Sequence, residues 1–412
     1  MKHLVRSLCV FALFSFVALT QEPNWNQFRG PHSVNHSFST GIAKSWSAGG
    51  PKLLWKVETL GIGFSNLCFY GDKMYTLGDH GDTCNVIAMD CATGKEIWKV
   101  ALAKSGDGGG RHIGPFATPA CDGETVYAYG QFGDFAAFDA KDGKERWRKN
   151  IPGDLGGGKM SIWGFSPSPI LDGDKILLPI GGDGGTLGAF DKTGKLLWRT
   201  AQITDLAAYT SVVPTTIGGV KQYMLLTGST LAGISPTDGK TLWEAEFPGQ
   251  TAVCSDPVLC GDVIMASCHY RVGAYFYRIA KEGNGFKATK TNDDGLQNLI
   301  SHHGGIVSVG DHFYLLTNRE LACVDAKTGN IVWTNESVGK GSLIYVDGKL
   351  IVRGEKDAGT IALVEATPSG YKELGKFDQP ERSNANSWTY PVVVDKKLYI
   401  RDQGLLLCYD LN

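Results

Sequence analysis

Apolar positions in this chain gather in short runs that flank turns containing Gly or Asp, and no long segment shows the 3.6-residue spacing of an amphipathic helix. The most regular unit reads as a strand, a tight turn and a second strand that carries one Trp. Its five copies are NVIAMDCATGKEIW, DFAAFDAKDGKERW, TLGAFDKTGKLLW, TLAGISPTDGKTLW and ELACVDAKTGNIVW. The pattern therefore predicts an all-β protein built from one repeated unit.

The Trp of this unit sets the period of the repeat. Six Trp residues share the position: Trp55, Trp98, Trp147, Trp198, Trp243 and Trp333. The first five lie 43 to 51 residues apart, which is typical of the four-stranded blades of a β-propeller. We interpret these indoles as packing elements between neighbouring blades, placed beside Gly-containing turns, and not as a ligand cage.

A second repeated segment gives the number of blades. It reads as a hairpin and occurs eight times, as LCFYGDKMYTL, PACDGETVYAY, PILDGDKILLP, PTTIGGVKQYMLL, PVLCGDVIMA, IVSVGDHFYLL, LIYVDGKLIV and PVVVDKKLYI. The last copy has no Trp strand after it, and the strand around Trp55 has no hairpin before it. We therefore predict an eight-bladed propeller of four-stranded antiparallel blades, closed by pairing the strand near Trp55 with the C-terminal blade, since an open ring would leave two unpaired edges.

The repeat also divides the chain. Residues 1–20 have a basic start, with Lys2 and Arg6, followed by an apolar run, and are predicted to be a cleaved signal peptide. Residues 21–50 are expected to form an N-terminal strap, and residues 51–412 the propeller domain. No later segment is expected to cross a membrane as a helix, so we expect a periplasmic or secreted protein.

Charge and cysteine content narrow the function classes. Removal of Lys2 and Arg6 takes the formal net charge from −2 to −4, and no block of Lys or Arg occurs, which argues against nucleic acid as a partner. Nine Cys remain without Cys9, an odd number, and Cys323 and Cys408 occupy a position held by Ala in other repeats, so they are expected in the core. Oxidation of Cys84 with Cys91 stays open, and the chain is expected to be a monomer.

Function in a propeller usually lies in the loops around the central channel. The candidate binding residues on these loops are Arg111, His112, Trp163, Tyr209, His302, His303, Asn386 and Trp388. His302 and His303 are adjacent, so on a strand their side chains would point to opposite faces and could not bind one metal ion. No metal site and no catalytic residue are predicted from spacing alone.

The AxDxxTGKxxW repeats resemble those of the quinoprotein-like, or PQQ-repeat, eight-bladed propellers over nearly all of the mature chain. In these repeats an Asp precedes the Gly turn and the Trp follows it, whereas a WD40 repeat has adjacent Trp and Asp residues. The Asp residues concerned are Asp90, Asp139, Asp191 and Asp325. The opening segment NWNQFRGPHSVNHS also looks like the start of exported proteins of this kind. The family contains quinoprotein dehydrogenases and also propellers that lack the cofactor, such as the BamB scaffold.

For a dehydrogenase, the resemblance implies a quinone held over a Trp, commonly under a disulfide of adjacent Cys, beside calcium and an Asp base. Trp163 or Trp388 could then supply the floor, Arg111 a partner for a carboxylate, and Asp205 an acid. The adjacent Cys pair is absent, however, and no calcium ligands match residue by residue. We therefore favour a non-catalytic propeller that binds a protein, peptide or glycan; a PQQ- and calcium-dependent alcohol or sugar dehydrogenase is the alternative.

Overall fold

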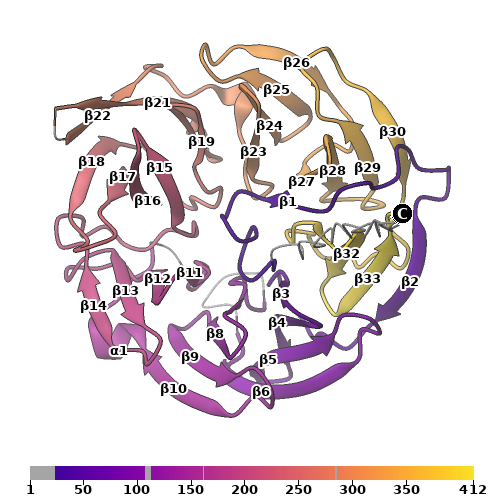
Figure 1. Ribbon diagram of the computed structural model, residues 1–412, viewed down its shortest axis with the longest axis horizontal. Helices are drawn as coiled ribbons and strands as arrows, with labels where there is room; N and C mark the ends of the chain where they lie inside the picture. The colour runs from indigo at the N-terminus through magenta and orange to yellow at the C-terminus, as the bar shows by residue number, and fades with distance from the viewer. Residues whose placement is uncertain (1–23, 107–112, 161, 284) are drawn as a thin grey trace, which may run out of the picture.

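The computed structural model describes residues 24–106, 113–160, 162–283 and 285–412. In these residues the strands form eight sheets that surround a central axis like blades (Figure 1). Each sheet contains four antiparallel strands in hairpin order, and one sheet carries a fifth strand. The predicted all-β, eight-bladed propeller is confirmed.

The strands follow the chain from blade to blade. Blade one contains β3 (Cys68–Tyr70), β4 (Lys73–His80), β5 (Thr83–Asp90) and β6 (Glu96–Lys104), and blade two contains β7 (Ala120–Cys121), β8 (Thr125–Tyr129), β9 (Asp134–Asp139) and β10 (Glu145–Asn150). Blade three contains β11 (Ile170–Asp172), β12 (Lys175–Pro179), β13 (Leu187–Asp191) and β14 (Leu196–Arg199), and blade four contains β15 (Val213–Ile217), β16 (Val220–Leu226), β17 (Thr230–Ile234) and β18 (Thr241–Glu246). Blades five and six contain β19 (Val258–Cys260), β20 (Val263–Cys268), β21 (Gly273–Glu282) and β22 (Gly285–Lys290); and β23 (Ile306–Val309), β24 (His312–Leu316), β25 (Leu321–Asp325) and β26 (Ile331–Asn335). Blade seven contains β27 (Gly341–Val346), β28 (Lys349–Gly354), β29 (Ile361–Glu365), β30 (Glu373–Phe377) and the added β1 (His36–Ser37), and blade eight contains β31 (Val392–Val394), β32 (Lys397–Asp402), β33 (Leu405–Asp410) and β2 (Lys52–Val57). A short helix α1 (Ile151–Leu155) and a 3₁₀ turn η1 (Gln297–Leu299) lie in loops, and no helix in the described ranges is long and apolar enough to cross a membrane.

Blade eight combines strands from both ends of the sequence. Strand β2 pairs antiparallel with β33, and Trp55 lies opposite Cys408. This register matches that of the other blades, where Trp98 lies opposite Ala88 and Trp147 opposite Ala137. The N-terminal and C-terminal strands therefore share one sheet, and the ring has no open edge at this point.

The segment before β2 runs from the channel outward between blades seven and eight (Figure 1). Its strand β1 adds to β27 in parallel, with His36 opposite Tyr345. Arg29, almost fully buried, donates from Nη2 to the carbonyl of Ile306 at 2.6 Å and forms an ion pair with Asp256 at 3.4 Å. We call residues 24–50 the strap; it is packed into the ring by strand pairing and by a buried charge pair.

Each repeat Trp in the first part of the ring packs on a turn glycine of the next blade. A Cβ added at Gly194 would lie 2.8 Å from the indole of Trp147, and one at Gly143 would lie 2.8 Å from that of Trp98. Both glycines have positive φ, +81° and +76°. The indole of Trp147 also donates from Nε1 to the carbonyl of Lys192, at 2.8 Å. The Thr-Gly or Asp-Gly turn therefore supplies a flat backbone surface on which the neighbouring indole rests.

The Asp of the repeat closes its own turn. Asp90 accepts hydrogen bonds from the backbone N–H of Thr93 at 2.8 Å and from its hydroxyl at 2.6 Å, and Asp325 does the same with Thr328. This bonding explains the spacing of Asp and Thr in the repeat.

The cysteines of the described chain are free thiols. Cys323 and Cys408 are fully buried, as expected for core positions, and the possible Cys84–Cys91 disulfide is not formed. No disulfide therefore contributes to the stability of this part of the chain.

Candidate functional site

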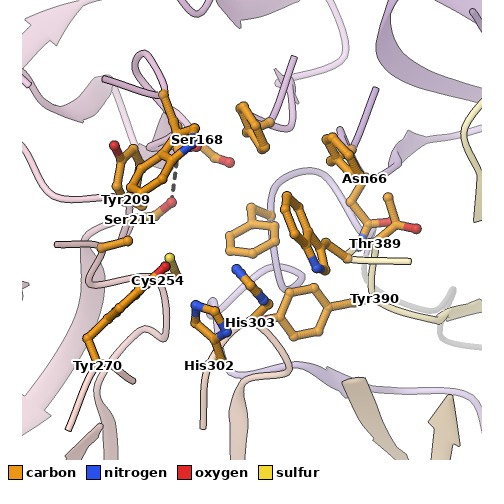
Figure 2. Close-up of a pocket in the computed structure, with 17 residues that line it drawn as sticks. Asn66, Ser168, Tyr209, Ser211, Cys254, Tyr270, His302, His303, Thr389 and Tyr390 are labelled. Atoms are coloured by element: carbon orange, nitrogen blue, oxygen red, sulfur yellow. Dashed lines mark hydrogen bonds between the residues drawn. The ribbon is translucent and has the colours of Figure 1, made fainter. Parts of the chain in front are cut away.

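A cavity of about 200 Å³ lies where the loops between successive blades meet around the channel (Figure 2). It is lined by Phe28, Phe64, Asn66, Phe116, Trp163, Ser166, Ser168, Tyr209, Ser211, Ala252, Cys254, Tyr270, His302, His303, Trp388, Thr389 and Tyr390. Phe28 belongs to the strap and Tyr270 to the turn between β20 and β21, and the remaining residues come from segments that lead into the first strand of a blade. The site is thus shared by most of the ring.

A ladder of hydrogen bonds links successive blades, and three of its members, Asn66, Ser168 and Ser211, line the cavity. The backbone N–H of Ser168 donates to the hydroxyl of Ser211 at 2.9 Å, as Figure 2 shows, and the N–H of Thr118 donates to the hydroxyl of Ser168 at 2.9 Å. The N–H of Asn66 donates to the hydroxyl of Thr118 at 3.1 Å, and that of Ser211 to Asp256 at 2.8 Å. Blades two to five therefore each supply the acceptor for the blade before them.

This ladder was not predicted from the sequence, although a repeated position in the sequence marks its members. Each of its members stands two residues before the first strand of its blade: Asn66, Thr118, Ser168, Ser211 and Asp256. A hydroxyl, amide or carboxyl side chain repeated at one place before five of the eight hairpins would have indicated the position.

The ladder ends on a buried ion pair. Burial raises the pKa of Asp256, whereas Arg29 and the N–H of Ser211 act in the opposite direction. Its Oδ1 accepts from Ser211 and its Oδ2 faces Arg29 of the strap. The carboxyl group is therefore engaged in structure and does not line the cavity.

A series of aromatic rings also lines the cavity. Phe116 stacks on Phe64 with centroids 5.2 Å apart, Phe64 lies 4.6 Å from Trp388, and Trp388 stacks on His303 at 4.4 Å. The indole Nε1 of Trp388 donates to Glu355 at 3.1 Å. We call Phe116, Phe64, Trp388 and His303 the aromatic wall.

A buried guanidinium holds the loop that carries Trp388. Arg353, on β28, donates to the hydroxyls of Ser387 and Thr389, at 3.1 Å each, and burial lowers its pKa to about 10. Because both neighbours of Trp388 are fixed by one rigid fork, the indole is placed in a defined position.

The two adjacent histidines correct the sequence-based expectation. Residues 302–304 form a bend and not a strand, and the imidazole rings of His302 and His303 lie 3.6 Å apart, centroid to centroid. Their donor nitrogens and the Sγ of Cys254 lie within 4.8 Å of one another (Figure 2). The prediction that these histidines face opposite sides and cannot share a metal ion was therefore wrong, because the alternation of a strand does not apply here.

The protonation of this cluster follows from its burial. Desolvation, with smaller contributions from Lys340 and His269, lowers the pKa of His302 to about 3. Burial raises the pKa of the Cys254 thiol. Both ring nitrogens of His302 are buried without a hydrogen-bond partner. At neutral pH this imidazole is uncharged.

The predicted binding residues divide into three groups. Trp163, Tyr209, His302, His303 and Trp388 line the cavity. Asn386 lies outside its lining, and Arg111 and His112 lie outside the described residues. Cys254, Phe64 and Tyr270 were missed, since nothing in the local sequence marks a single Cys, Phe or Tyr as part of a shared site.

The residues present do not fit calcium beside a quinone. Calcium takes six to eight oxygen ligands, largely from carboxylates. Among the described lining residues none is Asp or Glu, and the amide of Asn66 is the type of ligand that remains. Asp205, the expected acid, is not among the lining residues and accepts a hydrogen bond from Thr227 at 2.5 Å. The nitrogen and sulfur donors of the cavity belong to a different coordination chemistry.

Comparisons with known proteins agree on the fold. A europium-containing methanol dehydrogenase superposes with a TM-score of 0.68 at 12% identity, covering 92% of this chain and 89% of that one. The quinohemoprotein alcohol dehydrogenase ADHIIG from Pseudomonas putida HK5 gives 0.65 at 14% identity, covering 95% and 80%. Sqt1 of Saccharomyces cerevisiae gives 0.55 at 10% identity, covering 89% and 99%. At these identities the likeness shows the fold alone.

The sequence itself matches a family profile over most of its length. No curated protein matches the chain. The profile described as outer membrane protein assembly factor BamB matches residues 82–335 and 281–410, which together include the hairpin strands of blades two to seven, the last two strands of blade one and three of the four strands of blade eight. The resemblance to PQQ-repeat propellers is thereby confirmed, and the chain belongs to the family that this BamB profile describes.

Proposed function

We propose that this chain is an exported, non-catalytic binding protein that holds the end of a glycan or peptide partner in the loop-face cavity. The observation that carries the proposal is that stacked aromatic rings and hydroxyl groups line the same small cavity. Aromatic faces pack against the apolar face of a ring, while hydroxyls such as those of Ser168 and Ser211 each keep a hydrogen to donate. A terminal sugar ring has both kinds of surface.

The size of the cavity supports a partner that inserts one group. Pockets for whole drug-sized ligands usually hold about 300–1,000 Å³, and this one holds about 200 Å³. One sugar ring or one aromatic side chain would occupy the cavity, and the rest of the partner would lie on the surrounding loops.

The chemistry of the lining supports binding over dehydrogenation. Removal of hydride from an alcohol needs a base at the hydroxyl and an electrophile at the quinone. The described lining offers no carboxylate to serve as that base or to hold a calcium ion as that electrophile. The dehydrogenase alternative therefore has no supporting observation at this site.

The proposal is tested by screening saccharides and aromatic peptides against the purified protein, following tryptophan fluorescence and melting temperature. We expect a saccharide to raise the melting temperature and to lose its binding in Phe64→Ala. Ile97→Ala, an exposed position on the outer strand β6, is the matched control and should bind normally. Equal binding by wild type and Phe64→Ala, or no binding of either ligand class, would contradict the proposal.

A further inference from the structure

Cys254, His302 and His303 form a cluster that the binding function does not explain. Their side-chain donor atoms lie within 4.8 Å of one another at one end of the cavity. They come from two different blade connections, β18 to β19 and β22 to β23. A buried polar atom without a partner destabilises the fold, and both ring nitrogens of His302 are in that state among the described residues. The imidazole of His302 therefore has the capacity to bind a further group.

We propose that Cys254, His302 and His303 bind a zinc ion whose fourth coordination position opens into the cavity. Thiolate and imidazole are the ligands that zinc prefers, and three protein ligands leave a tetrahedral zinc ion one position for water or for an atom of a bound molecule. The proposal concerns the metal alone and stands apart from the identity of the glycan or peptide.

The geometry requires a small contraction. Tetrahedral zinc, with Zn–N of about 2.0–2.1 Å and Zn–S of about 2.3 Å, places neighbouring donors roughly 3.3–3.6 Å apart. Donor separations of up to 4.8 Å reach that range through side-chain rotation of Cys254 and the two imidazoles. The ligands are already gathered, so binding orders few additional groups.

Neighbouring rings orient the two imidazoles. His303 stacks on Trp388, which is itself bonded to Glu355, and the edge of His302 meets the ring of Tyr270 at 5.4 Å. The charge of Lys340, which acts on His302, is compensated by its ion pair with Glu355 at 2.8 Å. These contacts fix the ring planes as the outer groups of a metal site do.

The fourth position gives the metal a role in binding. A zinc ion with an open position accepts an oxygen atom of a ligand or of water, and this position would open toward the other residues that line the cavity. A hydroxyl or carboxylate oxygen of the inserted group would then be fixed at one end of the cavity.

The test uses Co²⁺ as a spectroscopic substitute for Zn²⁺ in protein freed of metal by a chelator. We expect one Co²⁺ per chain, with tetrahedral d–d bands and a sulfur-to-cobalt charge-transfer band, and displacement by Zn²⁺. Cys254→Ser should remove the charge-transfer band, and both it and His302→Gln should weaken metal binding at least tenfold. Cys91→Ser, a thiol outside the cluster, is the matched control and should leave both unchanged.

A second measurement covers the case in which a variant does not fold. Zn²⁺ should protect Cys254 of the wild-type protein from alkylation, as read by mass spectrometry, and Ca²⁺ should not. Absence of stoichiometric Co²⁺ or Zn²⁺ binding, or an unchanged charge-transfer band in folded Cys254→Ser, would overturn the proposal. The saccharide screen depends neither on the metal titration nor on the alkylation experiment, so the zinc site and the binding function can be contradicted separately.

Discussion

At the scale of single residues, the contact between an indole and a glycine joins one blade to the next. Gly94, Gly143, Gly194 and Gly239 each lie against the Trp of the preceding blade, with an added Cβ at 2.4 to 2.8 Å from an indole atom. The side chain that glycine lacks would occupy the place of the ring. Both members of the pair are therefore needed, which is why Trp and Gly recur together in the sequence.

We predict that Gly194→Ala lowers the free energy of unfolding by roughly 2–4 kcal/mol, through positive-φ strain and displacement of Trp147. Gly173→Ala is the matched control, because Gly173 lies in the same blade with φ of +61° and open space around it. It should cost only the strain, about 1 kcal/mol. Equal losses for the two variants in urea unfolding would show that the indole contact contributes nothing.

A half-buried histidine, His36, should make stability depend on pH. Burial, with a smaller effect of Arg29, lowers the pKa of His36 to about 4 from an unfolded value of 6.5. The unfolded chain therefore binds more protons between these values, and stability falls as the pH drops from about 6.5 to 4. Between pH 7 and pH 5 this residue should account for a loss of roughly 1–2 kcal/mol.

The measurement compares wild type with His36→Phe, which keeps a ring beside Tyr345. The variant should lose less stability than the wild type over the same pH interval. A variant with the same pH dependence as wild type would show that His36 has the same pKa in the folded and the unfolded protein.

At the scale of elements, the strap links the channel to the ring. It places Phe28 in the cavity lining and Arg29 beside Asp256, and its strand β1 extends blade seven. The strap thus contributes to the site and to the fold through one short segment.

Arg29→Leu should destabilise the protein by about 3–5 kcal/mol, because it leaves the buried carboxyl of Asp256 without its partner. The double variant Arg29→Leu/Asp256→Leu should be less destabilised than the single one, since no buried charge is left over. Denaturant unfolding gives both values. A single variant within 1 kcal/mol of wild type would mean that the pair does not hold the strap.

At the scale of the whole molecule, the period of the sequence carried most of the information about the fold. Blade number and strand order follow from local hairpins and from the repeated Trp, which do not depend on distant parts of the chain. The eight-bladed architecture could therefore be predicted before any contact was known.

The site could be predicted only in part. Phe64, Cys254 and Trp388 lie far apart in the sequence and meet only because the ring brings their loops together. The orientation of His302 and His303 depends on a bend at residues 302–304, whereas the prediction assumed that these residues lie on a strand. Aromatic and histidine loop residues were found by composition, whereas their partner Cys254 and the hydrogen-bonded ladder needed the folded ring.

We propose that this member of the PQQ-repeat family binds a partner in its cavity and does not use quinone with calcium. The most direct test is a titration of the purified protein with PQQ and Ca²⁺, following absorbance and melting temperature together. The account predicts no saturable change in either signal. Saturable binding with a raised melting temperature would contradict the claim and return the site to a dehydrogenase.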